Sequence, residues 1–148
     1  MRRSREQVIW DFVQDWLRKA EGDLKAAERL LAFQEEDYFT AAFHAQQAAE
    51  KFLKVLLVRH QIPFPKTHDI QRLLDLADRA DTAIRPRLAS AVTLTPFGVE
   101  FRYPGDQVAD VQAARGALDQ ARRVREVVLE QLHGYLCQGR PQTRGSGG

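Results

Sequence analysis

Apolar side chains recur along this chain at spacings of three and four residues, and this period constrains the fold more than any other feature. On an α-helix such a spacing puts the apolar side chains on one face, whereas a half-buried strand alternates every second residue. Strand-like alternation is missing over any useful length. The sequence therefore predicts an all-α protein: an antiparallel helical bundle of about five helices, two long, two short and one long.

The first 60 residues are expected to form the two long helices. The first runs from about Val8 to Phe33, and a polar break follows it. Asp37 is then expected to cap a second helix from about Tyr38 to His60, because a carboxylate at that position accepts a free backbone N–H. Alanines line its apolar face and allow close approach of a neighbour, and the short connection makes the two helices antiparallel.

The remainder is expected to hold two short helices and a last long one. Closely spaced prolines after residue 62 exclude helix there. An aromatic stretch further on is expected to be an ordered loop packed on the bundle. Thr67 is expected to cap a short helix that continues through Ala77, and a fourth helix is expected from about Thr82 to Thr93. A loop from Thr95 to Gly105 follows, and Asp106 is expected to cap the last helix. We expect one domain over 1–137 and a disordered tail over 138–148.

Composition narrows the classes of function. With 22 basic and 20 acidic residues, the net charge is only +2, so the molecule as a whole does not attract nucleic acids strongly. A site for an anion therefore requires local clustering of basic residues. The single cysteine, Cys137, excludes an internal disulfide framework and a zinc site of several thiolates. Apolar runs such as 55–58 are far too short for a membrane span. We expect a soluble, cytoplasmic protein without a membrane segment.

Several common site motifs are missing from the sequence. It holds no phosphate loop, no Gly-rich dinucleotide fingerprint and no HExxH. The four histidines, His44, His60, His68 and His133, have no metal-ligand spacing. We therefore expect no metal site and no cofactor.

A polar stripe on the second helix is the first candidate site. Its spacings of four, three, four and three place the side chains on one face. Two lysines with a histidine and a glutamine suit a phosphate and a base edge. The alternative is a solvated helix face with a Glu50–Lys54 pair. The stripe consists of Thr40, His44, Gln47, Lys51 and Lys54.

The tripeptide Thr67-His68-Asp69 is the second candidate, because it stands at a predicted helix start. Helix N-termini favour anions and disfavour a protonated imidazole. We expect His68 to be neutral unless Asp69 offsets this effect. The alternative is simple capping of the first turn, with His68 packed on the preceding turn.

The third candidate is the aromatic loop around Arg102 and Tyr103. An arginine just before a helix can hold a phosphate through two parallel hydrogen bonds, and Tyr103 can stack or donate a hydrogen bond. The alternative is that the aromatic side chains plug the end of the bundle while Arg102 pairs with Glu100 or Asp106.

These elements, in this order, resemble the HEPN domain family, of the kind encoded beside minimal nucleotidyltransferases. The resemblance covers about residues 8 to 136. The segment 41–57 resembles the family's second helix, 67–74 and 102–104 are similar to its next two landmarks, and 20–27 resembles its first-helix pattern. It implies a homodimer and a minimal nucleotidyltransferase partner in a toxin–antitoxin-like pair. Other members are metal-independent ribonucleases, in which an arginine is followed after four to six residues by a histidine.

This sequence departs from that ribonuclease motif. Arg102 stands where the motif would begin, but Gln107, Val108 and Ala109 stand where its histidine would fall. None of these three side chains titrates near neutral pH, so none can protonate a leaving group in RNA cleavage. The sequence favours a binding protein over an enzyme, without deciding the question.

Three functions follow from these observations. The first is a HEPN protein that binds a nucleotide or nucleic-acid phosphate through the residues of the three candidates and partners a nucleotidyltransferase. The second is a metal-independent RNase toxin that uses Arg102 with His68 or His44. The third is a purely structural helical interaction module. The candidate ligand-binding residues are His44, Gln47, Lys51, Lys54, His68, Asp69, Arg102 and Tyr103, and the weak catalytic candidates are Arg102 and His68.

Overall fold

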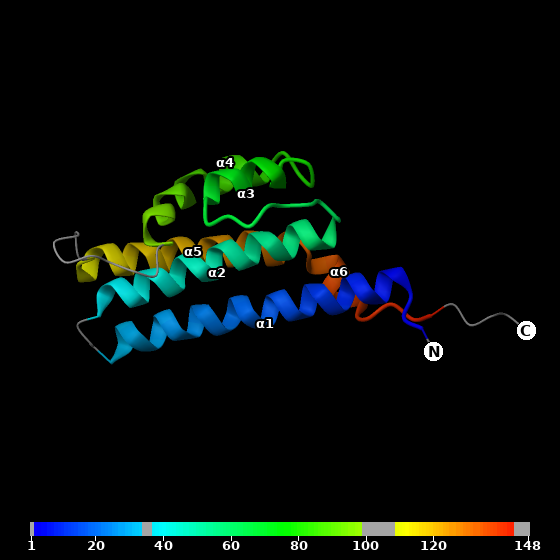
Figure 1. The fold of residues 1–148 in the computed structure, drawn as a ribbon, viewed down its shortest axis with the longest axis horizontal. Coiled ribbons are helices and arrows are strands. Elements are labelled where there is room, and N and C mark those ends of the chain that lie inside the picture. Colours follow the sequence, from blue (N-terminus) through cyan, green and yellow to red (C-terminus); the bar gives the residue numbers. More distant parts are fainter. Residues whose placement is uncertain (1, 34–36, 99–108, 144–148) are drawn as a thin grey trace, which may run out of the picture.

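The computed structural model describes residues 2–33, 37–98 and 109–143, and every regular element in these ranges is a helix (Figure 1). The all-α prediction is confirmed. Three long helices lie side by side: α1 (Arg5–Ala32), α2 (Tyr38–Arg59) and α5 (Val111–Gln131). The short helices α3 (Ile70–Ala77) and α4 (Ile84–Leu88), with a 3₁₀-helix η1 (Ala89–Phe97), form a layer over α2 and α5.

Helix α2 is the centre of the bundle, because it contacts α1, α3, η1 and α5. Its start is capped by Asp37, whose carboxylate accepts a hydrogen bond from the Thr40 backbone N–H, as predicted. Five of its alanines are fully or almost fully buried, which lets the neighbouring helices approach closely. These alanines are Ala41, Ala42, Ala45, Ala48 and Ala49.

Helix α1 begins with a capping box in which Ser4 and Gln7 satisfy each other's backbone N–H groups. Its apolar stripe faces α2 and α5 through residues such as Val13 and Leu24. Phe12, on the same helix, is 53% exposed.

The cap of α3 differs from the prediction. Asp69 caps this helix, because its carboxylate accepts from the Gln71 backbone N–H at 3.0 Å. Thr67 lies two residues earlier, and its hydroxyl reaches only the Asp69 backbone N–H, at 3.1 Å. The assignment of Thr67 as the cap was therefore wrong by two residues.

The predicted fourth helix is two elements. Helix α4 ends at Leu88, and η1 continues to Phe97, since β-branched residues and Pro96 disfavour a longer α-helix. The predicted loop thus begins after the helical segment, at Gly98, and not at Thr95. The rest of that loop, including Arg102, Tyr103 and Asp106, lies outside the described residues.

The last long helix begins at a different cap from the one predicted. Its cap is Asp110, which accepts from the Ala113 backbone N–H at 2.7 Å, so Asp106 is one turn too early. Helix α5 is capped by Leu132, and a sixth helix, α6 (His133–Gln138), follows directly. The prediction of about five helices did not separate α6 from the last long helix.

The expected tail is described as far as Thr143, and its first residues contact α1. Gln7 Nε2 donates to the Pro141 carbonyl at 2.9 Å, and Arg140 pairs with Asp11 at 3.0 Å. No helix in the described part of the chain is long and apolar enough to cross a membrane.

Candidate functional site

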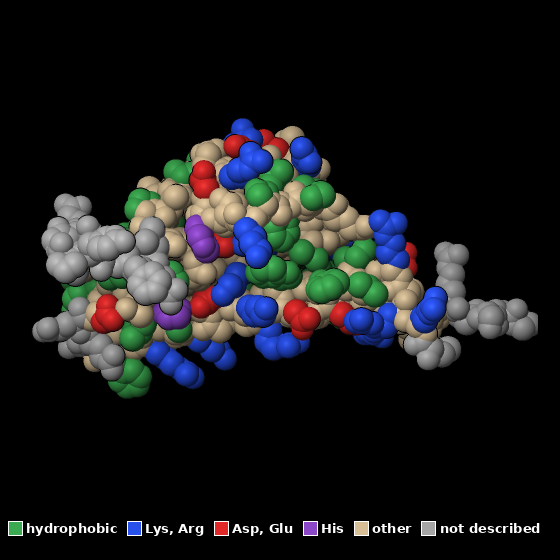
Figure 2. Space-filling model, in the orientation of Figure 1, with side chains coloured by type: hydrophobic (Ala, Val, Ile, Leu, Met, Phe, Trp, Pro, Cys, Tyr) green, Lys and Arg blue, Asp and Glu red, His purple; other side chains and the backbone are tan. Residues whose placement is uncertain are grey.

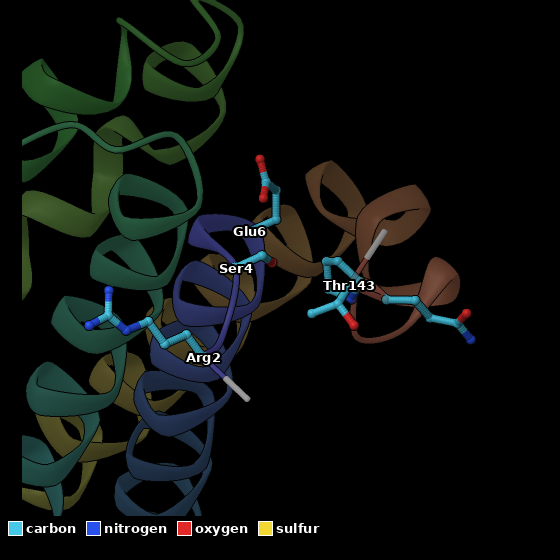
Figure 3. Close-up of a pocket in the computed structure, with 6 residues that line it drawn as sticks. Arg2, Ser4, Glu6 and Thr143 are labelled. Atoms are coloured by element: carbon cyan, nitrogen blue, oxygen red, sulfur yellow. The ribbon is translucent and has the colours of Figure 1, made fainter. Parts of the chain in front are cut away.

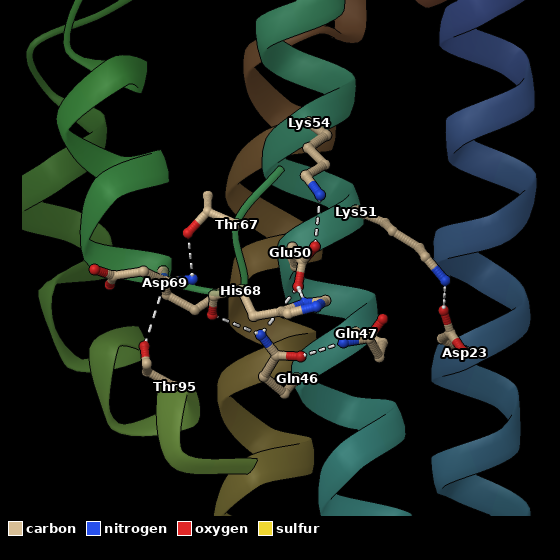
Figure 4. Close-up of polar contacts among 11 residues, drawn as sticks. Asp23, Gln46, Gln47, Glu50, Lys51, Lys54, Thr67, His68, Asp69 and Thr95 are labelled. Atoms are coloured by element: carbon tan, nitrogen blue, oxygen red, sulfur yellow. Dashed lines mark hydrogen bonds and ion pairs between the residues drawn. The ribbon is translucent and has the colours of Figure 1, made fainter. Parts of the chain in front are cut away.

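A buried carboxylate in the middle of α2 organises the main polar site. Glu50 is 3% exposed, and a carboxylate so far from water requires charged or hydrogen-bonding partners. Lys54 Nζ lies 2.5 Å from Glu50 Oε1, and His68 Nδ1 lies 2.9 Å from Glu50 Oε2 (Figure 4). The contact between His68 and Glu50 links the segment before α3 to α2.

Two glutamines extend the network. Gln46 Nε2 donates both to Glu50 Oε2 and to the His68 carbonyl, at 3.1 Å each. Gln47 Nε2 donates to Gln46 Oε1 at 2.6 Å. We call Gln46, Gln47, Glu50, Lys54 and His68 the Glu50 cluster.

The end of η1 closes over this cluster at a glycine. A Cβ atom on Gly98 would lie 3.1 Å from Gln46 Nε2 and 3.1 Å from His68 Cβ, tighter than ordinary contacts. A side chain there would require Gln46 and His68 to shift by a few tenths of an ångström, and Gly98 lies directly against His68.

His68 is held at one ring nitrogen. A carboxylate oxygen accepts, so His68 Nδ1 donates to Glu50 Oε2. The His68 side chain is 64% exposed. Among the described residues, no hydrogen bond is made by its Nε2.

Lys54 is committed to interactions inside the protein. Its ammonium nitrogen lies 5.5 Å from the Trp16 ring centroid and 5.6 Å from that of Phe64, in addition to its ion pair with Glu50. The Glu50–Lys54 pair of the alternative interpretation is present, but it is buried and does not lie on a solvated face. Lys54 stabilises the negative charge of Glu50 from within.

A second carboxylate gathers the other half of the polar stripe. His44 Nδ1 lies 3.0 Å from Asp23 Oδ1 on α1, and Lys51 forms an ion pair with Asp23 Oδ2. Burial raises the pKa of the Asp23 carboxyl, but the hydrogen bonds from His44 and Lys51 outweigh this effect and hold the pKa below its ordinary value. We call these three residues the Asp23 cluster, and Figure 4 shows Lys51 reaching across to Asp23.

The predicted site residues are thus divided between two clusters. Lys54, His68 and Gln47 belong to the Glu50 cluster, while His44 and Lys51 belong to the Asp23 cluster. Asp69 serves as the cap of α3. Arg102 and Tyr103 lie outside the described residues.

Sequence reasoning missed Gln46, Glu50 and Asp23 as members of a site. The spacing of four between Gln46, Glu50 and Lys54 was a usable signal, because residues four apart meet on a helix. Asp23 gave no such signal, because its partners lie on another helix.

Figure 2 shows two histidine side chains among lysine, arginine and acidic groups on the face that carries α2 and α3. A cavity of about 650 Å³ lies away from both clusters, between the start of α1 and the chain near Thr143 (Figure 3). Arg2 and Glu6 line it, but no member of either cluster does. Within the described ranges, no group of three or more metal-ligating side chains is gathered.

Comparison with known proteins places these clusters in a family context. The family model for the HEPN domain matches residues 13–132, a span that includes both clusters. A search of the curated proteins found no match.

Two solved structures share the fold. TT1696 from Thermus thermophilus is 32% identical with a TM-score of 0.66, over 81% of this chain and 98% of that one. ST0689, described as an archaeal HEPN homologue, is 24% identical with a TM-score of 0.64, over 81% of this chain and 97% of that one.

Proposed function

This chain belongs to the HEPN domain family, and from that premise we propose that it binds a nucleotide or nucleic-acid phosphate and partners a minimal nucleotidyltransferase in a toxin–antitoxin-like pair. The observation that carries the binding proposal is the contact between His68 and the buried Glu50. It fixes an exposed imidazole in one orientation, with its Nε2 free to meet a phosphate oxygen.

Neither cluster carries a large net charge, so we expect a ligand to be held mainly by hydrogen bonds and less by long-range attraction between charges. Each cluster has one carboxylate, one lysine and one histidine, so each is neutral until its histidine is protonated. Lys51 has three N–H donors and is 23% exposed, so it keeps donors for a phosphate beside its bond to Asp23. His68 and Lys51 are the groups on which we expect anion binding to depend most.

The partner proposal rests on family membership and on apolar side chains that this chain leaves uncovered. Phe12 on α1 and Phe33, the residue that ends α1, are 53% and 76% exposed. Large exposed aromatic groups are typical of protein contacts. We propose that a second copy of this chain, in a homodimer, or the nucleotidyltransferase covers them.

The binding proposal is tested by fluorescence anisotropy with labelled ATP and with a labelled single-stranded RNA. We expect the full chain to bind at least one of them, and His68→Gln to weaken that binding about tenfold or more. His133→Gln is the matched control, because His133 is exposed on α6, away from both clusters. Equal affinities of the two variants for the labelled ligand would contradict the proposal.

A second candidate function is a metal-independent ribonuclease that uses Arg102 with His68. A carboxylate that orients an imidazole is a common arrangement for general acid–base catalysis, and Glu50 and His68 have it. Gly98 lies against His68, and the four residues of chain from there to Arg102 span at most about 14 Å when extended. RNA cleavage without metal, lost in Arg102→Ala, would favour this candidate.

The third candidate, a structural helical module, predicts neither binding nor cleavage. In that case the Glu50 cluster would serve only to fix the segment before α3 to α2. A folded protein that neither binds ATP or RNA nor cleaves RNA at any concentration would support the structural candidate.

A further inference from the structure

A separate cavity lies at the opposite end of α2 from its capped start. Its volume is about 330 Å³, and its lining includes Arg5, Glu6, Arg59, Gln61 and Tyr135. Two features of this lining point to a ligand, and neither of them involves the Glu50 or the Asp23 cluster.

The first feature is an arginine that is stacked but unpaired. The guanidinium carbon of Arg59 lies 4.0 Å from the Tyr135 ring centroid, and Trp10 supports the same ring at 5.1 Å between centroids. Among the described residues no carboxylate forms an ion pair with Arg59. Stacking fixes the plane of a guanidinium and leaves the N–H groups on its edge free for an oxyanion.

The second feature is the way α2 ends. Gln61 has a φ of 55°, the left-handed conformation that glycine adopts most readily after a helix. A glutamine at this position places an amide in the cavity, where Arg5 donates to its Oε1. Arg5 is thereby held beside Arg59 at the same cavity, and within the described ranges it too has no acidic partner.

From these features we propose that the cavity binds a small phosphate monoester, held by Arg59 and Arg5. The charges of Arg5, Arg59 and Glu6 sum to +1, which suits an anion. The volume lies within the range of small-molecule sites. The site is distinct from the Glu50 cluster, since Glu50 and Arg59 are nine residues apart on α2, about 14 Å along its axis.

The test is an NMR titration of the full chain with inorganic phosphate and, separately, with AMP, following the side-chain Nε–H resonance of Arg59. We expect a saturable shift with both probes, because the phosphate is the recognised group. Arg59→Gln should weaken binding about tenfold or more, judged from backbone resonances around the cavity. Gln61→Gly relieves the left-handed φ and removes the side chain that accepts from Arg5 but keeps both arginines, so it should weaken binding less.

Two control variants establish whether the Arg59 shift reports binding in this cavity. Arg72→Gln removes an exposed arginine of α3 and should leave the affinity unchanged. His68→Gln, which tests the Glu50 cluster, should also leave the Arg59 shift unchanged. The proposal is overturned if the Arg59 resonance shows no saturable shift up to about 10 mM of either probe. It is equally overturned if folded Arg59→Gln binds as the unmodified chain does, or if His68→Gln abolishes the shift.

Discussion

His68 Nδ1 and Glu50 Oε2 lie 2.9 Å apart and join an exposed imidazole to a carboxylate inside the helical bundle. The pair links the segment before α3 to the middle of α2. Lys54 neutralises the same carboxylate from its other oxygen, at 2.5 Å. The orientation of His68 and the stability of the bundle centre therefore depend on one side chain.

Replacement of Glu50 by glutamine should destabilise the protein strongly. Glu50→Gln keeps the shape but leaves the Lys54 ammonium buried without its counterion, and breaking a buried ion pair from one side costs about 3–5 kcal/mol. Urea unfolding followed by circular dichroism measures the change in the free energy of unfolding. Glu130→Gln breaks the exposed pair with Arg87, which solvent screens, and should cost much less. Similar losses in the two variants would show that Glu50 has no special role.

Addition of a methyl group at Gly98 should disturb the Glu50 cluster. The new Cβ would press on Gln46 Nε2 and His68 Cβ, so Gly98→Ala should lower the free energy of unfolding by about 1–3 kcal/mol and shift the His68 ring resonances. Gly116→Ala provides the control. Gly116 lies within α5 with nothing near its added Cβ, so alanine should stabilise the protein by about 0.5–1 kcal/mol. Stabilisation in both variants would contradict the close packing at Gly98.

The Asp23 cluster should make stability depend on pH in the acid range. Because the pKa of Asp23 is lower in the folded protein than its ordinary value of 3.8, the unfolded chain binds the proton more readily. The stabilising contribution is therefore complete above about pH 4–5 and is lost as the pH falls below 3.8 through the folded pKa. Asp23→Asn should lose this part of the acid dependence, measured by urea unfolding between pH 2 and pH 6. An unchanged acid slope in the variant would rule the cluster out as its source.

The helices could be predicted because their signals are local. Asp37 stands directly before an alanine-rich run, and its capping role follows from the next three residues. The break at Leu132 has no comparable signal, because the apolar spacing continues into α6. The caps of α3 and α5 were misplaced because Thr67 and Asp106 are good capping residues near the correct positions, and only the helix geometry decides between neighbours.

The site could be predicted only in part, because its pairs join distant segments. The stripe on α2 identified His44, Lys51 and Lys54, but it gave no indication that Asp23 on α1 would hold His44 and Lys51 apart from Lys54. The end of η1 closes over α2 at Gly98, against Gln46 and His68, a contact that no local pattern indicates.

The measurement that most directly separates a binding protein from a ribonuclease is RNA cleavage in excess chelator. The purified full chain is incubated with end-labelled single-stranded RNA beside Arg102→Ala, and the products are resolved on a denaturing gel. The account predicts intact RNA in both samples, because no titratable side chain follows Arg102 at the spacing that cleavage requires. RNA fragments that form with the unmodified chain and vanish with Arg102→Ala would contradict it.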